Sequence, residues 1–344
     1  MTPSPPHAVP TAAQSGGVII LRSAAIATLV LGLAAGGTSA AAEHPDLSGV
    51  WTNASVTKLT RSGGALVVSE AEARQIAAGA NRGLDADSAP TAQTDRPPPE
   101  GNVGGYNAFW LDPGRALGMV KGERRTSWLV DPADGRLPLS DAGRKLIAEH
   151  RALHDSDRPP ANPEGLEPWD RCLIGSRGSG GPGMLNNIYN SNYQIVQTPS
   201  SVVIVVEMIH DARTVPLFPD KATAEAHHGP AALRPWFGDS VGWWEGDALV
   251  VETVDVNPQQ GAAGPIFLSP QARVTERLRR ISPSRISYEF KVEDPAYYSQ
   301  AWRAEMSLEA IKGPVYEYAC HEGNYALVDI LKGARAKERE AGGK

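Results

Sequence analysis

The feature that most constrains the fold is a series of short β-type runs, separated by turn residues, from Asn187 onward. In one run Ile286, Tyr288, Phe290 and Val292 alternate with polar residues, as in a strand with one buried face. The expected strands cover residues 193–197, 202–209, 241–244, 248–254, 274–281, 285–292, 301–311 and 315–320. This spacing predicts a mainly β fold, an antiparallel meander that forms an up-and-down barrel or a curved sheet, with a two-sheet sandwich as the alternative.

A few helices are expected around these strands, including one at the C-terminal end. Ser69 and Glu72 have the spacing of a capping box, which predicts a helix that runs toward Ala80. Further helices are expected over residues 140–158 and 325–340. The chain from 43 to 344 is therefore predicted to be a single β-rich domain. Its helical and loop insertions are expected at 69–82, 83–105 and 140–168.

The first 42 residues have the pattern of a secretory signal peptide. Arg22 precedes an apolar run, Ser23–Leu33, and small residues then continue to Ala42. A membrane anchor is the alternative, but a membrane span needs about 20 apolar residues, and Arg22 interrupts this one. We therefore predict cleavage near Ala42, a periplasmic or secreted protein, and no stable membrane insertion after the signal is removed.

Composition and export together narrow the partners. The chain has 33 Lys and Arg against 39 Asp and Glu, a formal net charge of −6, which argues against nucleic acid or an anionic membrane as partner. No Walker loop is present and no GxGxxG opens a helix, so no nucleotide cofactor is expected. A small molecule is the expected partner, bound without a cofactor.

The only two cysteines, Cys172 and Cys320, lie in the part predicted to be exported. In an oxidising compartment they are candidates for one disulfide. Two separate buried thiols are the alternative. A nucleophile pair of Cys320 with His321 is disfavoured, because neighbours in a strand point to opposite faces.

Ionisable residues gather where the apolar run Val202–Ile209 ends. His210, Asp211 and Arg213 follow it directly, and Glu207 lies within it. If the strand stays regular, Glu207, Asp211 and Arg213 share one face, which predicts a ladder with a carboxylate held ionised by the guanidinium. The alternative is a structural salt bridge at the barrel end.

A second group of such residues follows the last expected strand. Tyr318 belongs to that strand, and His321 and Glu322 fall at the turn after it, where side chains can project toward a cavity. Histidine exchanges protons near neutral pH, and an adjacent carboxylate can orient it. The alternative is that His321 only bonds the backbone at the helix start.

Two further sets of residues carry groups that could bind a metal ion or a substrate. His210, Asp211, His321 and Glu322 have side chains that suit a divalent ion, but no HExxH or Cys/His spacing supports one, so no metal site is expected. The amide and phenol groups of Tyr189, Asn190 and Tyr193 suit the reading of sugar or phenolic hydroxyls, although they also suit turns and strand edges.

Several motifs together resemble a family of exported bacterial proteins that are mostly without an assigned activity. They include the segments 46–51 (DLSGVW), 207–211 (EMIHD) and 316–325 (YEYACHEGNY). The resemblance covers most of the chain after residue 42 and implies export and a single recurring fold, with no catalytic residues to carry over. The first segment is also similar to the opening strand of lipocalin-like barrels.

We predict a cofactor-independent acid–base enzyme, of lyase, hydratase, isomerase or hydrolase type, that acts on a small hydroxylated substrate such as a sugar derivative or phenolic. His210 or His321 would be the base, Asp211 or Glu322 would orient it, and Arg213 would stabilise an anion. Glu207 and Tyr318 are expected beside the substrate with Tyr189, Asn190 and Tyr193. The alternative is a periplasmic binding protein of β-barrel type without catalysis.

Overall fold

The computed structural model describes residues 44–87, 111–154, 160–175, 178–261 and 265–342. The predicted signal peptide and most of the predicted loop at 83–105 lie outside these residues. Within them, no helix has the length and apolar character needed to cross a bilayer.

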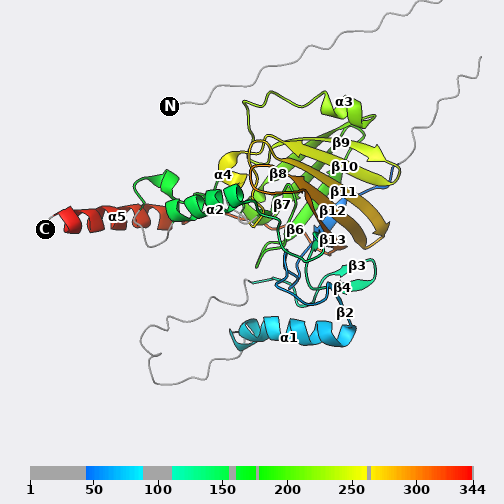
Figure 1. Ribbon diagram of the computed structural model, residues 1–344, viewed down its shortest axis with the longest axis horizontal. Helices are drawn as coiled ribbons and strands as arrows, with labels where there is room; N and C mark the ends of the chain where they lie inside the picture. The colour runs from blue at the N-terminus through cyan, green and yellow to red at the C-terminus, as the bar shows by residue number, and fades with distance from the viewer. Residues whose placement is uncertain (1–43, 88–110, 155–159, 176–177, 262–264, 343–344) are drawn as a thin grey trace, which may run out of the picture. The chain divides into compact units, whose positions relative to one another are not determined.

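Nine strands form a closed barrel (Figure 1). In their order around the barrel they are β1 (Gly49–Thr52), β6 (Asn192–Gln197), β7 (Ser201–Val206), β8 (Ala212–Phe218), β9 (Asp239–Glu245), β10 (Ala248–Val254), β11 (Arg273–Ser282), β12 (Arg285–Glu293) and β13 (Trp302–Ala310). The barrel closes where β1 pairs with β13, with Trp51 opposite Ala310. The predicted mainly β fold, compatible with a lipocalin-like barrel and carrying a C-terminal helix, is confirmed.

One strand pair departs from the antiparallel pattern. β8 and β9 are parallel, with Leu217 opposite Gly242. Parallel neighbours need a crossover connection, and the segment that contains α3 (Lys221–Glu225) provides it. In Figure 1 this short helix lies beside β9, in agreement with its contacts.

Smaller elements surround the barrel. β5 (Leu129–Asp131) pairs with β13, and β2 (Val67–Val68), β4 (Glu123–Arg125) and β3 (Met119–Val120) form a second sheet. The other helices are α1 (Glu70–Asp87), α2 (Asp141–Leu153), α4 (Pro258–Gly261) and α5 (Ala326–Gly342), with 3-10 turns η2 (Pro163–Gly165) and η4 (Met208–His210). The predicted capping box is present, since the backbone N–H of Ser69 donates to Glu72 Oε2 at 2.9 Å.

Two expected strands were wrong. The run 202–209 stays extended only to Val206, and residues 315–320 form no strand, although Tyr316 and Tyr318 alternate with other residue types there. β8 was not predicted, although its inner face is buried. Its sequence contains Pro216, which is disfavoured inside strands, and the charged Arg213, which is untypical of a buried face.

The barrel interior is filled by the protein itself. Aromatic rings of β12 and β13 pack edge to face, with Phe290 and Trp302 centroids 5.7 Å apart. A glycine-rich segment, Gly178–Asn187, enters the remaining space, where Met184 is completely buried. We call this stretch the inner segment.

Side chains from several strands hold the inner segment in place. The N–H of Gly183 donates to Glu276 Oε1 at 3.2 Å, and the N–H of Met184 donates to the Tyr288 hydroxyl at 2.8 Å. Gly181 has a φ of +82°, and a Cβ there would lie 2.3 Å from Arg213 Nη1. Glycine is therefore required at this position, both for the backbone conformation and for the close approach.

The charged centre of this network is the ion pair between Arg213 of β8 and Glu276 of β11, whose side chains are each 1% exposed. Arg213 Nη1 donates to Glu276 Oε1 at 3.1 Å. Burial opposes the charged form of Glu276 and so raises its pKa. The positive charge of Arg213 and the hydrogen bonds that the Glu276 carboxylate accepts outweigh this effect and hold its pKa below the usual range. The pair therefore stays charged inside the barrel and links strands on different sides of it.

Removing one partner of this pair should leave an uncompensated buried charge. We expect Arg213→Met or Glu276→Gln each to lower the free energy of unfolding by about 3–5 kcal/mol, and the double variant to lose less than the sum of the two. Urea unfolding of the wild type, the two single variants and the double variant measures the coupling free energy between the two residues. Additive losses would contradict the assignment of the pair as one unit.

Candidate functional site

The chain turns sharply where the first cluster of ionisable residues was predicted. β7 and β8 form a hairpin, and the N–H of Val206 donates to the carbonyl of Asp211 at 2.7 Å. Within the turn, Ile209 and His210 have φ values of 57° and 46°. The predicted ladder of Glu207, Asp211 and Arg213 on one strand face is therefore wrong, because the strand is not regular across residues 207–211.

The members of that cluster take separate positions. Arg213 lies inside the barrel on Glu276, and His210 is exposed, with Nδ1 3.2 Å from the carbonyl of Tyr318. Asp211 accepts a hydrogen bond of 2.7 Å from the N–H of Gly175. Burial raises the pKa of Asp211 to about 6, against the opposing effects of Gly175 and His210.

A disulfide joins Cys172 to Cys320, as predicted. The amide of Asn324 donates to Cys172 Sγ at 3.3 Å and adds a second contact between the two segments. Residues that flank the cysteines, far apart in sequence, are therefore brought together. This bond fixes one wall of a cleft against another.

The cleft lies next to the disulfide, outside the barrel, and has a volume of about 990 Å³. Its walls come from residues 169–170, 189–192 and 316–330, with Asp112 and Glu207. Four aromatic side chains line it: Trp169, Tyr189, Tyr316 and Tyr318. Three amide side chains add donors and acceptors: Asn190, Asn192 and Asn324.

Glu207 connects two walls of the cleft. Its carboxylate accepts from the N–H of Tyr316 at 3.1 Å and from the amide of Asn192 at 2.6 Å, and the residue is only 3% exposed. Because both oxygens are engaged with the protein, Glu207 acts as a positioning residue for the segment that begins at Tyr316.

The charge in the cleft is of one sign. Five carboxylates line it, namely Asp112, Asp170, Glu207, Glu317 and Glu322, and among the described residues no Lys, Arg or His does. Desolvation of the carboxyl and the nearby Glu167 carboxylate raise the pKa of Asp170. The cleft therefore favours neutral or positively charged molecules.

The sequence identified part of this cleft and missed the rest. Of the predicted site residues, Tyr189, Asn190, Glu207, Tyr318 and Glu322 line it, whereas the two predicted histidines do not. Trp169 and Asp170 were missed. Their proximity to Cys172 was the available signal, since a bond to Cys320 places them beside the 316–325 segment.

Tyr193, predicted to contact substrate, lies inside the barrel instead. It is completely buried, and its hydroxyl donates to the carbonyl of Ser179 at 2.9 Å and accepts from the amide of Asn53 at 3.1 Å. Tyr193 points inward because it is one of the alternate residues of β6 that face the core. It therefore supports the inner segment and cannot reach a ligand in the cleft.

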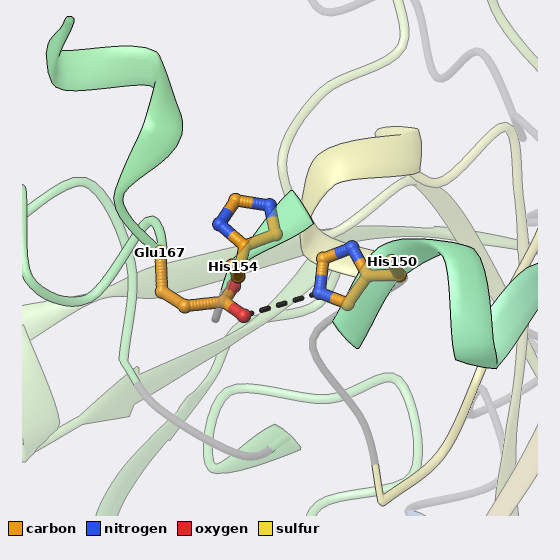
Figure 2. Close-up of side chains that lie close together, drawn as sticks. All are labelled: His150, His154 and Glu167. Atoms are coloured by element: carbon orange, nitrogen blue, oxygen red, sulfur yellow. Dashed lines mark hydrogen bonds and ion pairs between the residues drawn. The ribbon is translucent and has the colours of Figure 1, made fainter. Parts of the chain in front are cut away.

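His150, His154 and Glu167 form a separate cluster, shown in Figure 2. The histidines are four residues apart at the C-terminal end of α2, and Glu167 comes from the segment after η2. His150 Nε2 lies 3.1 Å from Glu167 Oε1. This cluster was not predicted from the sequence, although His150 and His154 are four residues apart at the end of a predicted helix.

The disulfide should contribute to stability because it closes a loop across 148 residues of sequence. We expect Cys172→Ala/Cys320→Ala to lower the free energy of unfolding by about 2–5 kcal/mol in guanidinium chloride. Thiol titration of the unfolded, unreduced chain should find no free thiol. Two titrating thiols, or an unchanged unfolding curve in the variant, would refute this.

The pKa of Asp211 gives a prediction with a defined pH window. The pKa of Asp211 is higher in the folded than in the unfolded chain, so protonation of its carboxyl favours the folded state. This contribution to the free energy of unfolding is complete below about pH 4 and is lost as pH rises through about 6. We expect Asp211→Asn to stabilise the fold by about 1–3 kcal/mol near pH 8 and to have little effect below about pH 4. Unfolding free energies that differ equally at both pH values would contradict this.

Comparison of the chain with family models, with curated proteins and with solved structures gives no match in any of the three. The resemblance of the sequence motifs to exported bacterial proteins therefore stays a prediction. Function is argued from the geometry of the cleft.

Proposed function

We propose that this protein is an exported binding protein for a small hydroxylated molecule that carries no negative charge. The observation that supports this most directly is the cleft beside the disulfide, with its four aromatic rings, three amides and five carboxylates. Its volume of about 990 Å³ is at the upper end of the range for small-molecule sites.

The lining chemistry favours sugars and phenolic glycosides. Aromatic rings offer flat apolar faces for the C–H faces of a sugar or for another ring. Carboxylates and amide oxygens accept hydrogen bonds from hydroxyl groups, and amide nitrogens donate them. Uronic acids and phosphorylated sugars are disfavoured, because no described cationic side chain lines the cleft to offset their charge.

The barrel itself is a poor candidate for the binding site. In many barrels of this size one ligand occupies the interior. Here the inner segment and the Arg213–Glu276 pair fill that space. The proposal therefore places the ligand outside the strands, where the predicted site residues Tyr189, Asn190 and Tyr318 contribute side chains.

An exported location agrees with other features of the chain. The disulfide is of the kind that persists in oxidising compartments. Residues 1–42 have the pattern of a signal peptide. A periplasmic or secreted location accounts for both features.

Acid–base catalysis on the same class of molecule is the second candidate function. The observation that favours it is Asp170, a carboxyl group in the cleft whose pKa is raised by desolvation and by Glu167. A carboxyl group with a raised pKa keeps its proton to a higher pH than an ordinary aspartic acid, which suits it better to donate a proton to a leaving oxygen. In this version of a lyase or hydrolase, the carboxylates of the cleft replace His210 and His321 as the proton-transfer groups.

Calorimetric titration with neutral disaccharides and phenolic glycosides tests the proposal, with the matched uronic acids as charged controls. We expect the neutral ligands to bind at least about tenfold more tightly than the uronates. Tyr316→Ala should weaken binding about 5–10-fold, because a stacking ring is lost.

Tyr325→Ala is the matched control, since Tyr325 is 75% exposed, Tyr316 is 71% exposed, and Tyr325 does not line the cleft. The affinity of Tyr325→Ala for the neutral ligands should stay within about twofold of the wild-type affinity. Preferential binding of uronates, or equal losses in both tyrosine variants, would contradict the proposal. Product formation during the titration that Asp170→Asn abolishes would favour the enzyme over the binding protein.

A further inference from the structure

The cluster of His150, His154 and Glu167 has the composition of a transition-metal site. One ligand atom from each residue can be chosen so that all three lie within 4.8 Å of one another. In a tetrahedral zinc site, metal–ligand distances near 2.0–2.2 Å place ligand atoms about 3.3 Å apart. His150 Nε2 and Glu167 Oε1 already lie at 3.1 Å, so small rotations of the side chains bring the set to that geometry.

Two atoms in the cluster need an explanation that hydrogen bonding does not give. His154 Nδ1 and Glu167 Oε2 are both buried, and neither has a hydrogen-bond partner in the part of the chain that the structure describes. A buried polar atom without a partner costs about 1–3 kcal/mol, so native proteins usually satisfy such atoms. A bound cation would satisfy both.

The histidine at 228 provides a contrast within the same protein. Its two ring nitrogens lie 2.8 Å from Asp239 Oδ2 and 3.3 Å from Glu252 Oε1, and Arg273 also pairs with Glu252. Each ring nitrogen of His228 therefore has a carboxylate oxygen within hydrogen-bond distance in the described part of the chain. A structural role accounts for His228, whereas it leaves two atoms of the His150–His154–Glu167 cluster unexplained.

The backbone around the cluster holds the three side chains close to one another. Helical spacing of four residues puts His150 and His154 on one face, and their ring centroids lie 4.4 Å apart. The carbonyl of Glu167 accepts from the N–H of Asp170, and Cys172 of the disulfide follows shortly after. Glu167 is therefore held in a turn that the disulfide anchors.

We propose that His150, His154 and Glu167 bind one divalent transition-metal ion of the zinc type. Two imidazoles and one carboxylate suit Zn²⁺, Co²⁺ or Ni²⁺, whereas Mg²⁺ and Ca²⁺ prefer sites made of oxygen atoms. Three protein ligands leave a fourth position for water. The proposal does not rest on ligand binding in the cleft, because none of the three residues lines it. Glu167 does link the two sites, since it also raises the pKa of Asp170 in the cleft wall.

Metal binding to the full chain tests the proposal directly. The protein is stripped with a chelator, dialysed against Zn²⁺ and analysed for metal content, and Co²⁺ binding is followed by its visible absorption. We expect one Zn²⁺ per chain, which excess Mg²⁺ or Ca²⁺ does not displace, and a rise in the melting temperature when Zn²⁺ binds. His154→Ala and Glu167→Gln should each weaken Zn²⁺ binding more than about 100-fold.

His227→Ala is the control, because it removes an exposed imidazole near another helix end, and its Zn²⁺ affinity should stay within about twofold of the wild type. The melting temperatures of the metal-free variants separate loss of binding from loss of folding. Absence of stoichiometric Zn²⁺ in the wild type would overturn the proposal. So would affinities in His154→Ala and Glu167→Gln that match the control.

Discussion

The ion pair between Arg213 and Glu276 links β8, β11 and the inner segment within the closed barrel. Two unit charges in an apolar interior are stable only as partners, and here each is also bonded to neighbouring groups: Arg213 donates to the Gly180 carbonyl and the Thr253 hydroxyl, and Glu276 accepts from the Gly183 N–H and the Tyr288 hydroxyl. The pair therefore fixes where the glycine-rich stretch can lie, because Gly181 lies close to Arg213 and the N–H of Gly183 donates to Glu276. Once that stretch occupies the interior, any sizeable ligand has to bind outside the strands.

The position of the cleft follows from this constraint and from the disulfide. Cys172 lies shortly before the inner segment in the sequence. Its bond to Cys320 therefore holds the 316–325 segment next to the chain that leads into the inner segment. Glu207, at the turn between β7 and β8, then holds Tyr316 through its backbone. The resulting walls are aromatic, amide-rich and acidic, which is the basis for proposing a neutral or cationic hydroxylated ligand.

The barrel could be predicted from the sequence because its strands carry a strong period-2 pattern, as in the run from Ile286 to Val292. Helix starts at Ser69 and Ser140 could be predicted because capping is local. The partner of Arg213 could not, since Glu276 is 63 residues away and the strand that carries Arg213 was not itself predicted. The cleft was partly predicted, because local chemistry identified Tyr189 and Tyr318, whereas Trp169 reaches it only through long-range pairing.

We propose that the ligand binds in the outer cleft, because the chain itself occupies the barrel interior. Hydrogen–deuterium exchange of the full chain, with and without a saturating neutral disaccharide, tests this most directly. We expect slower exchange in residues 187–192 and 316–327 and unchanged exchange in β10, β11 and β12. Protection confined to those strands, with none at the cleft, would show that the ligand enters the barrel and would overturn the proposal.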